Sequence, residues 1–176
     1  ASGSCYGIPN EYPTSEKFIK KIVGSDEFIN SIERYCIWIE KDDLKKALLI
    51  KPIKERTLKV KKYRENKEDS SAKKLANAPY RFREQFQTTT NSIIIPSVSS
   101  EKRRYLPIGF INNKTIITNL AFAIYDCEVW MFGILISRMH YIWVKNVIGR
   151  LETRIRYSNK IGYNTFPCPK LNLKHK

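Results

Sequence analysis

The chain has 176 residues and is 42% hydrophobic, which is enough for a sizeable core in one domain, with or without an appended segment. Its 32 Lys and Arg exceed its 17 Asp and Glu, so the formal net charge is +15. This excess favours a polyanion as partner, although enrichment in Lys, Ile and Asn is also typical of AT-rich genomes. We see no signal peptide and no run of about 18 apolar residues, and expect a cytoplasmic protein without a membrane partner.

The four cysteines, at positions 5, 36, 127 and 168, lie far apart and form no CxxC pair. A zinc knuckle or redox motif therefore has little support, and we expect reduced thiols. The opening residues 1–4 resemble a cloning remnant, and no initiator Met is present, which indicates a fragment of a longer protein. We expect residues 1–15 to be an irregular linker or tag remnant, 16–169 the main domain and 170–176 a basic tail.

The first half of the chain predicts mostly helices. Ser15 is a candidate cap for a helix over 16–23 that ends at Gly24, and residues 31–40 are apolar on both faces, which is typical of a central strand. Asp42 or Asp43 can begin a helical region that reaches 66 and is interrupted by Pro52; a short helix follows over 70–77. Residues 41–79 hold 13 Lys or Arg against 6 Asp or Glu, which fits either a solvated helix pair or contacts with phosphates.

From residue 80 the composition favours strands. We predict them over residues 81–88, 92–98, 105–110, 115–119 and 121–125, separated by prolines and by the turn at Asn112 and Asn113. The loop over 97–104 carries the basic sequence SSEKRR between two of these strands.

Residues 133–149 contain no proline and repeat their apolar residues every 3.6 positions, so we predict one helix between two glycines. Arg138, Tyr141 and Lys145 then share a basic stripe. The opposite, packed arc consists of Leu135, Ile136, Met139, Ile142, Trp143 and Val147. After Gly149 the pattern alternates, which predicts an extended segment with Glu152, Arg154 and Arg156 on one face and Thr153, Ile155 and Tyr157 on the other.

Nothing in the sequence indicates catalysis by this chain alone. Its two histidines are His140, which we interpret as a hydrogen-bonded helix residue, and His175 near the C-terminus. No HExxH, GxSxG, GxxxxGK[ST], GxGxxG or [DN]PP[YF] motif and no PD…(D/E)xK set is present. Each tryptophan (Trp38, Trp130 and Trp143) lies in an apolar run, so we predict core positions rather than base stacking.

Five segments, in order, resemble the MmeI-like type IIG restriction-modification enzymes, which combine an endonuclease and an adenine-N6 DNA methyltransferase. They are FIKKIVGSDEFINSIERYCIWI (18–39), KKLANAPYRF (73–82), IIIPSVSSEKRRYLPIGF (93–110), FGILISRMHYIWVKNVIGRL (132–151) and RYSNKIGYNTFPCP (156–169). The part of the family that they resemble is the target recognition domain. One departure is Cys168, which stands where the family's FPWP has tryptophan.

The resemblance implies an α+β domain, a mixed β-sheet with flanking helices, that binds double-stranded DNA in a bacterial enzyme. The methyltransferase and nuclease domains of the same polypeptide are then its partners. The chain itself needs no cofactor, whereas the full-length enzyme is expected to use S-adenosylmethionine and Mg²⁺. The alternatives are a separate non-catalytic specificity subunit of a methyltransferase, a basic RNA-binding protein, and a catalytic domain whose site has no recognised motif.

Glu152 and Arg154 are the leading candidates for base reading. A carboxylate beside a guanidinium complements the major-groove edge of a C·G pair, which offers a cytosine N4 donor and guanine N7 and O6 acceptors. In the family resembled here, these positions correspond to a pair that reads the base beside the methylated adenine, so cytosine is expected 3′ of it. The alternative is an exposed ion pair worth less than about 1 kcal/mol.

Other candidates divide between groove and backbone contacts. Arg103 and Arg104, in the SSEKRR loop, are predicted to reach base edges or phosphates. The predicted contacts to the DNA backbone are Arg156, Ser158, Asn159, Arg138 and Lys145.

Overall fold

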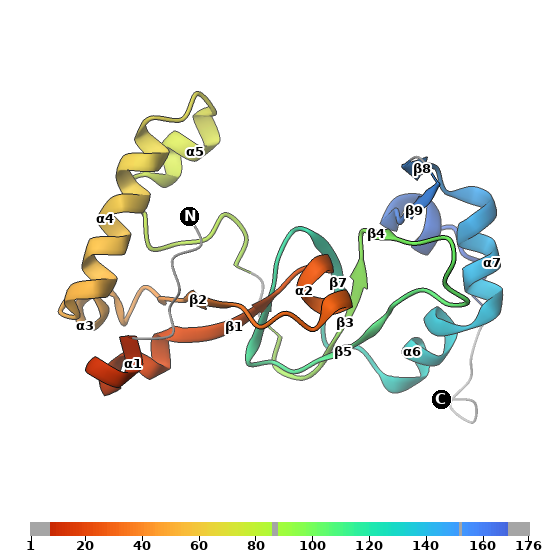
Figure 1. Ribbon diagram of the computed structural model, residues 1–176, viewed down its shortest axis with the longest axis horizontal. Helices are drawn as coiled ribbons and strands as arrows, with labels where there is room; N and C mark the ends of the chain where they lie inside the picture. The colour runs from red at the N-terminus through yellow and green to blue at the C-terminus, as the bar shows by residue number, and fades with distance from the viewer. Residues whose placement is uncertain (1–7, 86–87, 152, 169–176) are drawn as a thin grey trace. The chain divides into compact units, whose positions relative to one another are not determined.

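The computed structural model describes residues 8–85, 88–151 and 153–168 (Figure 1). Helices alternate with small β-sheets, each of three strands, which confirms the α+β class but replaces the one predicted sheet by several. The chain forms two compact units: unit 1 is residues 1–21 and 34–86, and unit 2 is residues 22–33 and 87–176. The predicted boundaries after residues 15 and 169 stay predictions.

Unit 1 begins with α1 (Ile8–Glu11), inside the segment expected to be irregular, and the 3₁₀ helix η1 (Pro13–Phe18). Strand β1 (Ile19–Val23) then pairs antiparallel with β2 (Tyr35–Ile37). The predicted helix over 16–23 is therefore wrong, because Pro13 starts a helical turn early and the β-branched residues after Phe18 favour a strand. The predicted central strand is also wrong, since β2 is short and lies at a sheet edge.

The helical region of unit 1 agrees with the sequence pattern. Helices α3 (Leu44–Leu48) and α4 (Lys51–Glu65) are separated at Pro52, which occupies the first turn of α4, where its missing N–H costs nothing. Helix α5 (Ser70–Leu75) follows, and the Asp69 carboxylate caps it by accepting from the Ser71 backbone N–H at 2.9 Å. The predicted strand over 81–88 is absent from the described part of that range.

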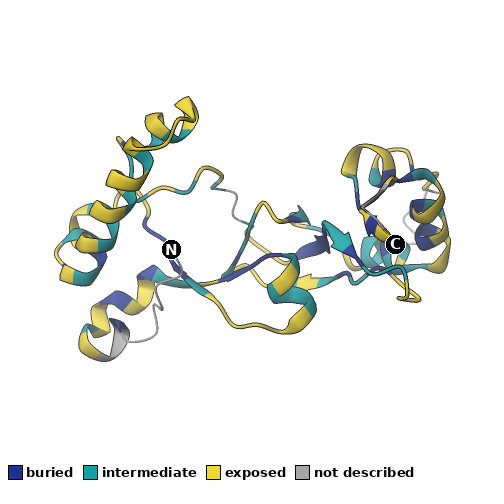
Figure 2. Cartoon of the chain, turned by 45° about the horizontal axis from the view of Figure 1, so that its top comes forward, coloured by how far each residue is buried: buried dark blue, intermediate teal, exposed yellow. Residues whose placement is uncertain are grey.

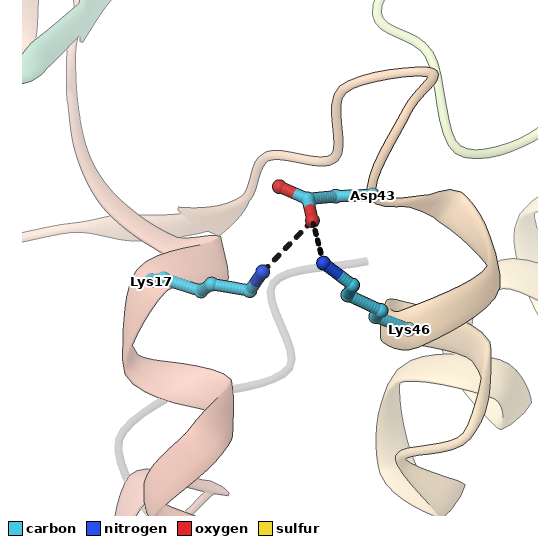
Figure 3. A network of polar contacts seen from close by, with 3 residues as sticks. All are labelled: Lys17, Asp43 and Lys46. Atoms are coloured by element: carbon cyan, nitrogen blue, oxygen red, sulfur yellow. Dashed lines mark hydrogen bonds and ion pairs between the residues drawn. The ribbon is translucent and has the colours of Figure 1, made fainter.

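Asp43 occupies the N-cap of α3 but its carboxylate makes no capping bond. Instead Oδ1 accepts from Lys17 Nζ at 2.9 Å and lies 3.7 Å from Lys46 Nζ (Figure 3). The hydrogen bond from Lys17 lowers the pKa of the Asp43 carboxyl. Because the three side chains are exposed to solvent, this cluster orients η1 against α3 more than it stabilises the fold.

The core of unit 1 joins η1, the segment after β2, α3 and α4. Its buried members are Phe18, Ile39, Ala47, Ile50 and Ile53. Trp38 is 3% exposed, and its ring stacks on that of Phe82 with 5.4 Å between centroids, so its predicted core position is confirmed.

Arg64, near the end of α4, holds the chain that returns from α5. Its Nη1 donates to the carbonyls of Leu75 at 3.0 Å and Ala78 at 3.2 Å, and its Nη2 donates to that of Arg81 at 2.7 Å. Burial lowers the pKa of this guanidinium. Only the planar fork of arginine can donate to several carbonyls in this way, so Arg64 has a structural role.

Unit 2 is built on β3 (Ser92–Pro96), whose residues are all buried. It lies between β5 (Gly109–Ile111) and β7 (Ala121–Ile124), antiparallel to both. Helix α2 (Ser25–Asn30) packs close to β5 at Gly109, where an added Cβ would come within 2.6 Å of the Phe28 ring. Strand β6 (Thr115–Ile117) precedes β7, so the predicted strands from 105 to 125 are confirmed, although shorter.

The C-terminal part of unit 2 holds α6 (Val129–Ile136), α7 (Arg138–Val147) and the π-helix η2 (Asn159–Tyr163) (Figure 1). The single helix predicted over 133–149 is wrong, because the chain breaks at Ser137, whose hydroxyl accepts from the His140 backbone N–H at 3.1 Å.

This break also changes which residues of α7 are buried. Buried and exposed residues alternate along α7 (Figure 2). Tyr141, predicted on the basic stripe, is 6% exposed, whereas Met139 and Ile142, predicted to pack, are 58% and 48% exposed. The break at Ser137 sets the rotation of α7 independently of α6, so one continuous helical period does not describe both.

His140 lies at the centre of this region with 0% exposure. Its Nδ1 is 2.7 Å from the Leu135 carbonyl oxygen, and its Nε2 is 3.4 Å from the Tyr157 hydroxyl. Its ring meets that of Phe166 edge-on, with 4.8 Å between centroids. The interpretation of His140 as a hydrogen-bonded helix residue is confirmed, and burial lowers the pKa of its imidazole below 6.5.

We expect Arg64→Ala to lower the free energy of unfolding by about 2 to 4 kcal/mol, because hydrogen bonds to a charged group contribute about 1.5 to 3 kcal/mol each and part of that is recovered from water. Urea unfolding measures the change. Lys62→Ala is the control: this exposed lysine of the same helix should cost less than about 0.5 kcal/mol. Equal decreases in the two variants would show that the three carbonyl hydrogen bonds contribute nothing.

We expect acid to destabilise the protein through His140. Its folded pKa is lowered, so the unfolded state takes up a proton first as the pH falls below 6.5, and the stability present above that pH is lost. His140→Asn keeps an N–H donor but cannot be protonated. Unfolding free energies measured between about pH 7 and pH 5 should therefore fall less in this variant than in the parent. Identical pH profiles would contradict this assignment.

Candidate nucleic-acid interface

The segment after Gly149 forms a β-hairpin. Strand β8 (Arg150–Leu151) pairs antiparallel with β9 (Arg154–Arg156), with Leu151 opposite Arg154 and two residues at the tip. The prediction of one extended segment is therefore wrong, because the chain reverses where neither Gly nor Asn marks a turn. Glu152 lies outside the described residues. A two-stranded ribbon of this kind has the width that the DNA major groove admits.

Within β9 the predicted alternation holds. Arg154 and Arg156 are exposed, whereas Ile155 between them is 3% exposed and belongs to the main core of unit 2. Other buried members of that core are Ile93, Leu106, Leu135, Tyr141, Val144 and Tyr157. The buried Ile155 anchors the strand, so the guanidinium groups of Arg154 and Arg156 point outward.

Strand β4 (Val98–Ser99) connects this hairpin to the basic loop. It pairs antiparallel with β9, with Ser99 opposite Ile155, and the Tyr157 N–H donates to the Ser97 carbonyl at 2.9 Å. The loop that carries Arg103 and Arg104 leaves directly from the end of β4. The structure therefore pairs the strand that carries Arg154 with the short strand that leads into the loop of Arg103 and Arg104.

The basic loop is held by its backbone while its arginines are exposed. The Tyr141 hydroxyl donates to the Glu101 carbonyl at 3.3 Å, and the Arg103 N–H donates to the Ser100 carbonyl at 3.3 Å. Arg103 and Arg104 are both exposed. The sequence did not reveal the role of Tyr141, whose ring is buried in the core while its hydroxyl reaches the loop.

Helix α7 presents the predicted backbone contacts Arg138 and Lys145 on one exposed side, with Ile142 between them. The two cations are seven residues apart, about 10 Å along the helix axis, and share the same stripe. The predicted stripe is confirmed for these two residues and wrong for Tyr141. Exposed cations on one rigid helix can neutralise phosphates without reading bases.

Ser158 and Asn159 begin the π-helix η2. The Ser158 hydroxyl accepts from the Ile161 N–H at 3.3 Å, and the Asn159 Oδ1 accepts from the Lys160 N–H at 2.9 Å. These oxygens therefore fix the turn that follows β9. Asn159 is exposed and Ser158 half-buried, so their donor groups lie near the surface, and their predicted contacts to the DNA backbone stay predictions.

The part of the chain that the structure describes holds no candidate metal centre. There, no three His, Cys, Asp or Glu side chains gather to hold a metal ion, and no helix is long and apolar enough to cross a membrane. A cavity of about 390 Å³ lies against α6, and its lining is mostly apolar and aromatic, with Trp130, Met131, Tyr163 and Phe166 among its residues.

This chain is similar to segments of longer proteins. A relative from Bacillus subtilis (strain 168), DNA methyltransferase A, is 46% identical over 167 residues, which is 95% of this chain and 19% of the relative. The solved structure of the type IIL restriction-modification enzyme MmeI in complex with DNA matches with a TM-score of 0.89 and 37% identity, covering 96% of this chain and 23% of that one. The chain thus spans about a fifth of the length of these relatives.

The family described as the MmeI target recognition domain matches residues 6–170, which is nearly the whole sequence. The five segments quoted from the sequence all lie within the match. The chain therefore belongs to the family of MmeI target recognition domains.

Proposed function

We propose that this chain recognises a sequence in double-stranded DNA as the target recognition domain of a longer, bifunctional restriction endonuclease and adenine-N6 DNA methyltransferase. The observation that carries the proposal is the β8–β9 hairpin, which exposes Arg154 and Arg156 on either side of the buried Ile155. A rigid ribbon with outward guanidinium groups fits the major groove, where arginine donates to guanine O6 and N7.

The candidate contacts divide into two kinds with separable effects. Exposed cations of α7 neutralise phosphates and give affinity for any sequence. Arg154 of the hairpin, with Glu152, and the arginines of the basic loop read base edges and give specificity, whereas Arg156 contacts the DNA backbone. Glu152 and Arg154 together complement a C·G pair, and the loop of Arg103 and Arg104 adds further groove contacts.

S-adenosylmethionine and Mg²⁺ belong, in this proposal, to other domains of the same polypeptide. The methyltransferase domain would flip out the target adenine and methylate it, while the present chain holds the duplex in register.

Exchanging the charges of Glu152 and Arg154 should change the base that the protein reads. In the full-length enzyme, Glu152→Lys with Arg154→Asp should replace cytosine as the base required 3′ of the methylated adenine, since the donor and acceptor positions are reversed. Sequencing that maps N6-methyladenine in cellular DNA measures the motif. Arg156→Gln, on the same strand, is the matched control and should weaken methylation without altering the motif. A motif that still requires cytosine after the exchange would exclude this pair as the reader.

Removing the two cations of α7 should weaken binding equally for all sequences. For Arg138→Gln with Lys145→Gln, the slope of log affinity against log salt should fall by about 0.9 for each phosphate that the variant no longer neutralises. Fluorescence anisotropy with matched and mismatched duplexes measures both quantities. Asn146→Ala, an uncharged exposed neighbour, should leave the slope unchanged. Weaker binding confined to the matched duplex would mean that these residues read bases instead.

A further inference from the structure

Helix α4 separates its basic residues into two sets. Arg64 donates to three carbonyl groups, whereas Lys51, Lys54 and Lys62 are exposed. At about 100° per residue, these three lysines fall within an arc of roughly 80° centred near Leu58, which is 50% exposed. The buried Ile53 lies on the opposite side of the helix. The helix therefore has one outward face with three lysines, and the only acidic residue within the same arc is Glu65, which lies 3.9 Å from Lys61.

The lysines of this face make no ion pairs within the described chain. Lys61, beside them, has Glu65 at 3.9 Å, but Lys51, Lys54 and Lys62 have no acidic partner among the described residues. Their charge is therefore open to an external anion. A compact ammonium on a flexible stem suits contact with phosphate oxygens that need no fixed geometry.

Helix stability does not explain the positions of Lys51 and Lys54. The first turn of α4 contains no acidic residue, although the positive end of the helix dipole favours carboxylates there. Lys51 and Lys54 are also three residues apart, a spacing at which like charges repel. An arrangement that works against the helix itself is consistent with a partner of negative charge.

We propose that this lysine face, Lys51, Lys54 and Lys62, is a second contact surface for the sugar-phosphate backbone of DNA. The proposal rests on the proposed function and adds a sequence-independent surface in unit 1 to the candidate residues of unit 2. The phosphates are neutralised by exposed ammonium groups and their condensed counterions are released, so the surface contributes affinity that depends on salt but not on base sequence.

The test uses the full-length polypeptide with Lys51, Lys54 and Lys62 all replaced by Gln. Gln and Lys have similar helix propensity, so α4 should persist, which circular dichroism checks. Binding to a duplex with the methylated motif and to a scrambled duplex is measured over a series of salt concentrations. The slope of log affinity against log salt should fall by about 0.9 for each phosphate that is no longer neutralised, up to about 2.7 for three, with the ratio between duplexes unchanged.

The matched control replaces the same three lysines by Arg, which keeps the charge and should keep the slope. An unchanged slope in the Gln variant, while the parent still distinguishes the duplexes, would overturn this inference alone and leave the proposed function intact. A change in the ratio between duplexes would also overturn it, because backbone contacts carry no sequence information. A parent that shows no sequence preference would instead reject the proposed function, and this inference with it.

Discussion

The burial of Ile155 is the constraint on which the candidate interface depends. This residue is 3% exposed, pairs with Ser99 of β4 and belongs to the core cluster that includes Val144 of α7. Its neighbours Arg154 and Arg156 must therefore point away from the core, because successive residues of a strand face opposite sides. Recognition of base edges needs side chains fixed to within a fraction of an ångström, and a strand anchored through its middle residue provides that precision better than a free loop.

The positively charged side chains fall into two groups. Some make contacts within the protein, and others face the solvent. Arg64 donates to three backbone carbonyls and so serves the fold of unit 1, whereas the exposed Lys17 and Lys46 converge on Asp43 and orient η1 against α3. Arg103, Arg104, Arg138 and Lys145 are exposed on elements whose backbones are held in place. A net charge of +15 is therefore a poor guide by itself, because only cations that the fold leaves outward can attract a polyanion.

Local signals in the sequence predicted local features of the structure. Pro52 predicted the division between α3 and α4, and the alternation around Ile155 predicted which side chains of β9 face the solvent. The sequence did not predict the hairpin. Tight hairpin turns favour Gly, Asn or Asp, which adopt a positive φ easily, and none of these residues directly follows Leu151. The pairing of β4 with β9 was equally hidden, because it joins segments more than 50 residues apart and depends on packing rather than on local propensity. The predicted base-reading role of Glu152 and Arg154 rests on a resemblance, and composition alone would not have indicated it.

The break between α6 and α7 shows how side chains can override a continuous helical period. If the helix continued, the Leu135 carbonyl would accept from the N–H of residue 139; instead the His140 ring meets it at 2.7 Å. The Ser137 hydroxyl in turn accepts from the His140 N–H, so two side chains satisfy backbone groups that the break exposes. The rotation of α7 that results buries Tyr141, whose hydroxyl reaches the Glu101 carbonyl in the basic loop, and turns Arg138 and Lys145 outward. A serine and a histidine three residues apart thus connect helix geometry to the placement of the candidate DNA contacts.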